Sequence, residues 1–171
     1  SPRNGSGGPS SYFYKGKPSY GWSPGMAQYG LPYYDLPNIN KIEDLKDPKL
    51  AQKMGKKMQR CMSKGDVVAN LAVTSLVTNA FLLSGMEIYR DWVIDYTDNW
   101  FKQANSNNGF LPDNIGLSGK VGEYIDGKWY GGLYGWTWPH GFYNIQMVAL
   151  VASANAYLLT QDKGYLDLPR I

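Results

Sequence analysis

Apolar residues lie on nearly every side of a helix formed by the run VVANLAVTSLVTNAFLLSG, which extends from Val67 to Gly85. A run of this length without a charged residue predicts a helix that is buried on all sides. Gly85 stands where a helix C-cap belongs. In the next run, MEIYRDWVIDYTDNWFKQA, apolar residues recur at the period of a helix with one wet face, at Tyr89, Trp92, Val93, Tyr96 and Trp100. The pattern therefore predicts an inner helix followed by an outer helix.

The end of this hairpin is repeated later in the chain. NAFLLSGMEIYRD, which starts at Asn79, aligns without gaps on NAYLLTQDKGYLD, which starts at Asn155, with identical residues at 6 of 13 positions. Repetition of a helix-turn-helix unit indicates stacked hairpins that share a core. The second unit stops where its outer helix is expected. We therefore expect the rest of a larger polypeptide, or another subunit, to complete the array.

The two ends of the remaining sequence differ in character. Residues 1–40 interleave Pro, Gly and Ser with tyrosines, which blocks long helices and predicts an extended aromatic arm. Residues 41–171 form the predicted helical-hairpin region. It opens with a helical stretch from Lys41 to Met62, in which Pro48 occupies the usual first helical position. The basic cluster KMGKKMQR in this stretch is typical of a solvated helix face.

A long connection rich in aromatic residues joins the two predicted hairpins. It runs over residues 105–140, and loops of this length inside compact domains are usually functional. The stretch GKWYGGLYGWTWPHGFYN begins in the second half of this connection. Seven of its eighteen residues are aromatic and five are Gly. Aromatic faces stack on the C–H faces of sugar rings. The rings expected to bind a sugar are Trp129, Tyr130, Tyr134, Trp136 and Trp138. The alternative is that individual rings fill space over the helix ends.

Paired inner and outer helices, together with GFLPDN, GGLYGWTWPHG and NAYLLT, resemble the α/α-toroid, or six-hairpin, superfamily of glycoside hydrolases and polysaccharide lyases. The resemblance covers roughly Asp66 to Ile171. It implies an all-α fold, of which this chain supplies about half a ring. It also implies that connections such as residues 105–140 line the substrate cleft. The repeat offset aligns His140 with Lys64 and Phe142 with Asp66, so Lys64 and Asp66 are expected at the same rim.

The resemblance suggests two chemistries for degrading a polysaccharide or oligosaccharide. Toroid lyases that β-eliminate uronate glycans use a His, Tyr and Asn set. His140, the chain's single histidine, and Tyr143 are the candidates to exchange protons, and Asn144 or Lys64 would hold the acid group. The usual Arg is not found nearby, and His140 could instead cap the helix. This lyase reaction is slightly preferred.

The rival chemistry is hydrolysis by a pair of carboxylates. Glu123 and Asp113 are the candidate pair, although Asp113 could instead bond backbone N–H groups within its loop. Asp126 precedes a glycine, which is typical of a tight turn. A third alternative is a non-catalytic helical-repeat module that binds a glycan or a peptide.

Composition narrows the possible ligands. A net charge of +3 over 171 residues is small for a nucleic-acid-binding surface, and the one basic cluster is typical of a solvated helix face, so no nucleic-acid partner is predicted. The single Cys61 and single histidine argue against a zinc centre. No cofactor is predicted, and a calcium ion held by loop oxygens is neither predicted nor ruled out. No run reaches the roughly 18 continuous apolar residues that a membrane-spanning helix needs, so no membrane partner is predicted. Only the carbohydrate interpretation favours a periplasmic or extracellular location.

Overall fold

The computed structural model describes residues 13–14, 17–18, 36–62, 64–132, 134–136 and 141–170. The fold is mostly helical, with strands of two residues each, which confirms the predicted all-α class. The chain divides into two compact units. One unit comprises residues 1–67 and 113–142, and the other comprises residues 68–112 and 143–171. The aromatic arm predicted for residues 1–40 lies mostly outside the described residues. Within it, β1 (Phe13–Tyr14) pairs antiparallel with β2 (Lys17–Pro18).

The second unit contains the predicted hairpin. A 3-10 helix, η2 (Val68–Val73), leads into α4 (Thr74–Ser84), and α5 (Glu87–Ser106) follows after two residues. Gly85 is the C-cap of α4 and has a φ of 68°, as the sequence predicted. The predicted C-terminal end of the inner helix is thus correct, but the first third of the predicted helix is a 3-10 helix.

One face of α5 is buried in this unit. Its buried residues are Val93, Thr97, Trp100 and Ala104, which follow one another at helical spacing. Trp92, predicted on the same face, is 39% exposed and stacks on Tyr96 with ring centroids 4.7 Å apart. The predicted stripe is therefore displaced by about one position, and Thr97 and Ala104 replace Trp92 in it.

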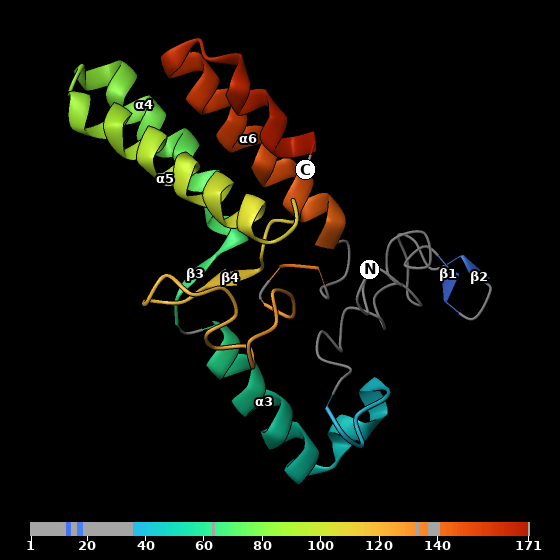
Figure 1. The fold of residues 1–171 in the computed structure, drawn as a ribbon. Helices are drawn as coiled ribbons and strands as arrows, with labels where there is room; N and C mark the ends of the chain where they lie inside the picture. Colours follow the sequence, from blue (N-terminus) through green and yellow to red (C-terminus); the bar gives the residue numbers. More distant parts are fainter. Residues whose placement is uncertain are drawn as a thin grey trace. The chain divides into compact units, whose positions relative to one another are not determined.

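Helix α6 (Gly141–Thr160) lies beside α4, and a 3-10 helix, η3 (Lys163–Arg170), follows it (Figure 1). The Asn155 side chain donates hydrogen bonds to the hydroxyl oxygens of Thr74, at 3.0 Å, and Ser75, at 3.1 Å. These bonds join the two apolar helices within the second unit.

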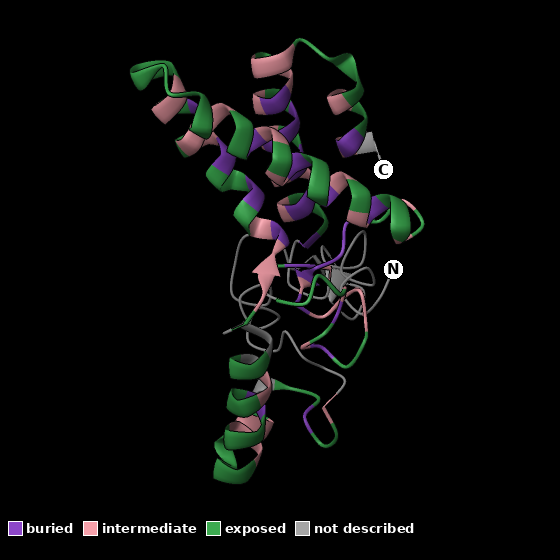
Figure 2. Cartoon of the chain, turned by 60° about the vertical axis from the view of Figure 1, so that its left-hand side comes forward, coloured by how far each residue is buried: buried purple, intermediate pink, exposed green. Residues whose placement is uncertain are grey.

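Neither apolar helix is buried on all sides, which corrects the expectation from the sequence. Figure 2 shows exposed positions along both helices. Leu76 and Leu83 of α4 are 71% and 89% exposed, and Met147 of α6 is 66% exposed. An apolar sequence shows that a helix can be buried, but only the neighbouring elements decide whether each face is covered.

The turns that end α4 and α6 have the same geometry. Gln161 follows α6 as Gly85 follows α4, and it also has a left-handed φ, of 60°. Each residue donates its backbone N–H to the carbonyl four residues earlier at 2.7 Å. Ser84 and Thr160 each donate a hydroxyl hydrogen bond to the carbonyl four residues earlier, and each accepts a bond from the N–H two residues later. These three matching hydrogen bonds are offset by the same 76 residues as the sequence repeat.

The first unit contains the other long helix. A 3-10 helix, η1 (Ile42–Lys46), precedes α3 (Pro48–Met62), so Pro48 begins the helix as predicted. Ile39, Met54 and Ile125 form a small buried core, against which three leucines pack, Leu36, Leu45 and Leu50. The strand β3 (Asp66–Val67) pairs antiparallel with β4 (Asn114–Ile115). These contacts hold the loop that follows α5 against the chain around α3.

In the part of the chain that the structure describes, α6 is long and apolar enough to cross a membrane by length and composition alone. The core helix of a soluble protein has the same properties. This finding therefore adds little for or against the prediction of no membrane partner.

Candidate functional site

The aromatic connection is organised around one buried carboxylate. Asp113 Oδ2 accepts hydrogen bonds from the backbone N–H groups of Gly131, at 2.6 Å, and Gly132, at 3.1 Å. Its Oδ1 accepts another from the N–H of Trp136 at 2.9 Å. The Asp113 side chain is fully buried. Burial raises the pKa of this carboxyl to about 7, and the three N–H groups oppose that rise.

Two glycines allow the loop to approach this carboxylate. A Cβ at Gly132 would come within 2.9 Å of Asp113 Cβ, and a Cβ at Gly135 would overlap the carboxylate itself. Only glycine therefore fits at these positions without a shift of the loop. Asp113 has the structural role that the sequence left open, because it bonds backbone N–H groups.

Glu123, the other candidate carboxylate, is exposed at the surface of the same unit. Its Oε2 accepts hydrogen bonds from the backbone N–H of Ser118, at 3.1 Å, and from the Ser118 hydroxyl, at 2.7 Å. These bonds lower the pKa of Glu123. A glycosidase general acid needs a raised pKa in order to carry a proton near neutral pH. The arrangement therefore suits a loop brace better than a general acid.

Three of the predicted sugar-binding rings lie together in the first unit. The Trp129 ring meets the rings of Tyr130 and Trp136 edge to face, with centroids 5.2 and 5.7 Å apart. The Trp136 ring also lies 6.4 Å from that of Phe142. We call these four residues the ring cluster. The two tryptophans and Tyr130 are partly buried, and Phe142 is 49% exposed. The cluster is thus accessible to a ligand while its members support one another.

The cluster carries a cation, which the sequence analysis missed. Lys128 Nζ lies 5.8 Å from the centre of the Tyr130 ring. An ammonium group over an aromatic face is attracted to the ring and stays close to it. A basic residue immediately before two aromatic residues was the signal available in the sequence.

The other predicted rim residues, Lys64 and Asp66, make contacts within the first unit. Lys64 Nζ lies 5.7 Å from the Tyr124 ring, and the Lys64 carbonyl accepts a hydrogen bond from the Asn114 side chain. Asp66 is in β3, opposite Ile115. These contacts place Lys64 and Asp66 beside the strand pair of the first unit.

Five predicted residues remain, all between positions 134 and 144 of the sequence. Tyr134 is 47% exposed and has a φ of 55°. Tyr143 and Asn144 occupy the first turn of α6, where Tyr143 is 45% exposed and Asn144 is partly buried. His140 and Trp138 lie outside the described residues.

A family model for a domain of unknown function, DUF8034, matches residues 1–171. The chain belongs to the DUF8034 family. No curated protein and no solved structure matches the chain.

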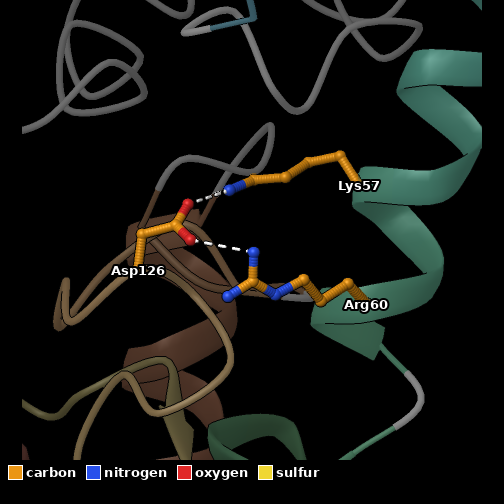
Figure 3. Close-up of polar contacts among 3 residues, drawn as sticks. All are labelled: Lys57, Arg60 and Asp126. Atoms are coloured by element: carbon orange, nitrogen blue, oxygen red, sulfur yellow. Dashed lines mark hydrogen bonds and ion pairs between the residues drawn. The ribbon is translucent and has the colours of Figure 1, made fainter.

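An ion pair in the DUF8034 domain joins α3 to the aromatic connection, and sequence analysis did not find it. Lys57 Nζ lies 2.5 Å from Asp126 Oδ2, and Arg60 Nη1 lies 3.0 Å from its Oδ1 (Figure 3). The hydrogen bond from Lys57, with the nearby positive charges, lowers the pKa of Asp126. Asp126 has the left-handed φ, 60°, that its predicted turn requires. Two residues of the predicted solvated face therefore have a specific partner 69 and 66 positions away in the sequence.

Among the described residues of the DUF8034 domain, no group of three or more His, Cys, Asp or Glu side chains could hold a metal ion. Asp113 is also unsuited to ligate a metal, because both of its oxygens already accept hydrogen bonds from the loop backbone.

Proposed function

We propose that this DUF8034 domain binds a carbohydrate through the ring cluster. The observation that carries the proposal is that partly exposed rings are held together on a loop tied to a buried carboxylate. Rings fixed before the ligand arrives lose little conformational entropy on binding. Stacking of aromatic rings on sugar C–H faces then supplies apolar contact without requiring a deep pocket.

The cation next to the ring cluster favours an acidic sugar. A carboxylate on a ligand stacked near Tyr130 would come close to Lys128, which lies over that ring. Charge-assisted contacts of this kind are stronger than neutral hydrogen bonds. The proposed ligand class is therefore a glycan that contains uronate residues.

We place the chain, as a further part of the proposal, in an α/α toroid built from successive hairpins. The support is the three matching hydrogen bonds at the turns after α4 and α6, at the offset of the sequence repeat. In this interpretation α4 and α6 are inner helices, and α5 and η3 are the outer elements that follow them.

β-Elimination of the bound glycan is the catalytic form of the proposal. In it His140, which lies outside the described residues, would take the proton from the uronate, and Tyr143, which is 45% exposed on the first turn of α6, would return one to the leaving oxygen. Hydrolysis is less well supported, because the pKa of Glu123 is lowered and the Asp113 carboxylate is buried and bonded to the backbone.

The binding test compares two tryptophans. We expect oligosaccharides containing uronate to bind the wild-type chain in calorimetric titrations, and Trp136→Ala to weaken binding at least about tenfold. Trp92→Ala is the matched control, because Trp92 is exposed on α5 and stacks on Tyr96 instead of on the cluster. Lys128→Gln should weaken binding of uronate ligands and leave neutral ligands unaffected. Equal losses in Trp136→Ala and Trp92→Ala would refute the assigned surface.

A spectroscopic assay tests the catalytic form separately. Elimination creates an unsaturated uronate, so absorbance in the far ultraviolet should rise when the chain is incubated with a uronate glycan. Tyr143→Phe should abolish that rise without changing the affinity for the ligand. New reducing ends without the absorbance would indicate hydrolysis. Binding without either product would leave the domain as a binding module.

A further inference from the structure

Helices α4 and α6 each expose an apolar face. Neither helix contains a charged residue. On η2 and α4, the exposed apolar residues that share one side are Val73, Leu76 and Leu83. We call these three residues the first face. On α6, the exposed side consists of Met147, Leu150, Ala154 and Leu158, which we call the second face. Exposed faces of this kind usually mark interaction sites.

The two faces are on opposite sides of equivalent helices. Leu71, Thr74 and Thr78 are buried, whereas the residues 76 positions later, Met147, Leu150 and Ala154, are exposed. Conversely, Ala149 and Ala152 of α6 are buried, whereas the residues 76 positions earlier, Val73 and Leu76, are exposed. Each helix therefore buries the side that the other leaves open.

The contact between α4 and α6 shows how two such helices pack. Asn155 of α6 bonds Thr74 and Ser75, which lie at the start of α4. Within the chain, the buried side of α4 is thus next to its neighbour α6. The open side of α4 is equivalent to the side that α6 buries. The same type of contact can therefore form again on the open side of α4 and on the open side of α6.

We propose that a second copy of the chain docks head to tail, with the second face of one copy against the first face of the next. The proposal rests on the hairpin repeat of the proposed function and not on carbohydrate binding. Such a contact is heterologous, because it joins two different surfaces, and it either closes into a ring or continues as a chain. It covers both apolar faces at once.

A second copy suits these faces better than a lipid bilayer. A spanning helix needs about 20 apolar residues, whereas α4 has 11 residues and leads into α5, which begins with the charged residues Glu87, Arg90 and Asp91. The opposite side of α6 is buried and carries Ser153, and Asn155 bonds α4. A bilayer would thus cover the second face and leave the first face exposed.

The experiment uses two variants that each disrupt one face, Leu76→Glu and Leu150→Glu. In sedimentation velocity measurements, we expect the mass of the wild-type chain to exceed 19.1 kDa and to rise with concentration. Each variant alone should remain a monomer. A mixture of the two should form a dimer of twice the monomer mass, because the intact second face of one variant can bind the intact first face of the other. Leu117→Glu, at an 83% exposed loop position, is the control and should associate like the wild type.

Several results would overturn the proposal. These are a wild-type chain that is monomeric at all concentrations, variants that associate as the wild type does, or folded variants that do not form a dimer when mixed. Binding of a monomeric wild-type chain to phosphatidylcholine vesicles would show instead that a membrane covers the apolar faces. Helix content by circular dichroism checks that the variants fold, and Leu76→Ser and Leu150→Ser replace any that do not. Because the mass is measured without sugar, failure here leaves carbohydrate binding untouched.

Discussion

The carboxylate of Asp113 accepts a hydrogen bond of 2.9 Å from the backbone N–H of Trp136, 23 residues later in the chain. This bond fixes the segment that presents one ring of the ring cluster. Two further bonds, from Gly131 and Gly132, attach the same carboxylate to the other end of that segment. A residue considered for catalysis thus positions the proposed binding surface.

Removal of this carboxylate should destabilise the first unit. Asp113→Ala leaves the backbone N–H groups of Gly131, Gly132 and Trp136 without their acceptor. We therefore expect the free energy of unfolding to fall by about 3 kcal/mol. Denaturant unfolding followed by tryptophan fluorescence measures this loss. Asp162→Ala, which removes a single bond to the N–H of Gly164 at an exposed turn, is the control and should cost much less. Equal costs would contradict the anchoring role.

The stability of the chain should depend on pH through Asp113. Its pKa is raised from 3.8 to about 7 in the folded chain, so the folded state binds a proton more tightly than the unfolded state. The stability that this provides is complete below about pH 4 and is lost as the pH rises through about 7. Urea unfolding across this range measures the slope. Asp113→Asn cannot titrate, so its slope should be smaller than that of the wild type, and an unchanged slope would contradict the prediction.

A matched pair of glycine substitutions tests the close approach in the loop. In Gly135→Ala, the new Cβ overlaps the Asp113 carboxylate, so we expect lower stability and weaker binding at the ring cluster. In Gly55→Ala, the new Cβ meets nothing within 4 Å and lies in helix α3, where alanine stabilises by about 0.5–1 kcal/mol. The midpoint temperature of thermal unfolding should therefore fall in Gly135→Ala and rise in Gly55→Ala. Parallel shifts would show that the loop is less tightly packed than described.

The ion pair between α3 and the loop should contribute modestly. Lys57→Gln removes the closer partner of Asp126, which is 45% exposed, so the expected loss is below about 1 kcal/mol. The pKa of Asp126 is lowered, so this contribution is present above the ordinary aspartate pKa and is lost as the pH falls below it. Lys56→Gln, at an exposed neighbouring position, is the control. An equal effect of both variants at neutral pH would argue against a specific pair.

The two matching turns predict opposite effects of glycine. Gly85→Ala introduces a Cβ at a φ of 68° with no other atom in contact, so backbone strain alone should cost about 1 kcal/mol. Gln161→Gly relieves the same strain at a φ of 60°, offset by loss of the Gln161 side-chain bond to the Leu158 carbonyl. The midpoint temperature of thermal unfolding should be lower than that of the wild type for Gly85→Ala, and equal to it or higher for Gln161→Gly. A large destabilisation by Gln161→Gly would contradict the equivalence of the turns.

The sequence determined the local elements of this protein. The helical period of α5, the proline that begins α3 and the glycine that ends α4 were readable because caps and periodicity depend on backbone geometry within a few residues. The same information located the aromatic loop and five of its rings. The carbohydrate function remains a prediction from that composition.

Only the tertiary structure decided which atoms these elements bring together. The hydrogen bonds that Trp136 donates to Asp113 and that Lys57 donates to Asp126 cross 23 and 69 residues, and no local pattern encodes such separations. Likewise, the sequence of α4 gives apolar side chains on every side, whereas burial depends on what packs against each side. That is why a helix predicted to be fully internal leaves Leu76 and Leu83 exposed.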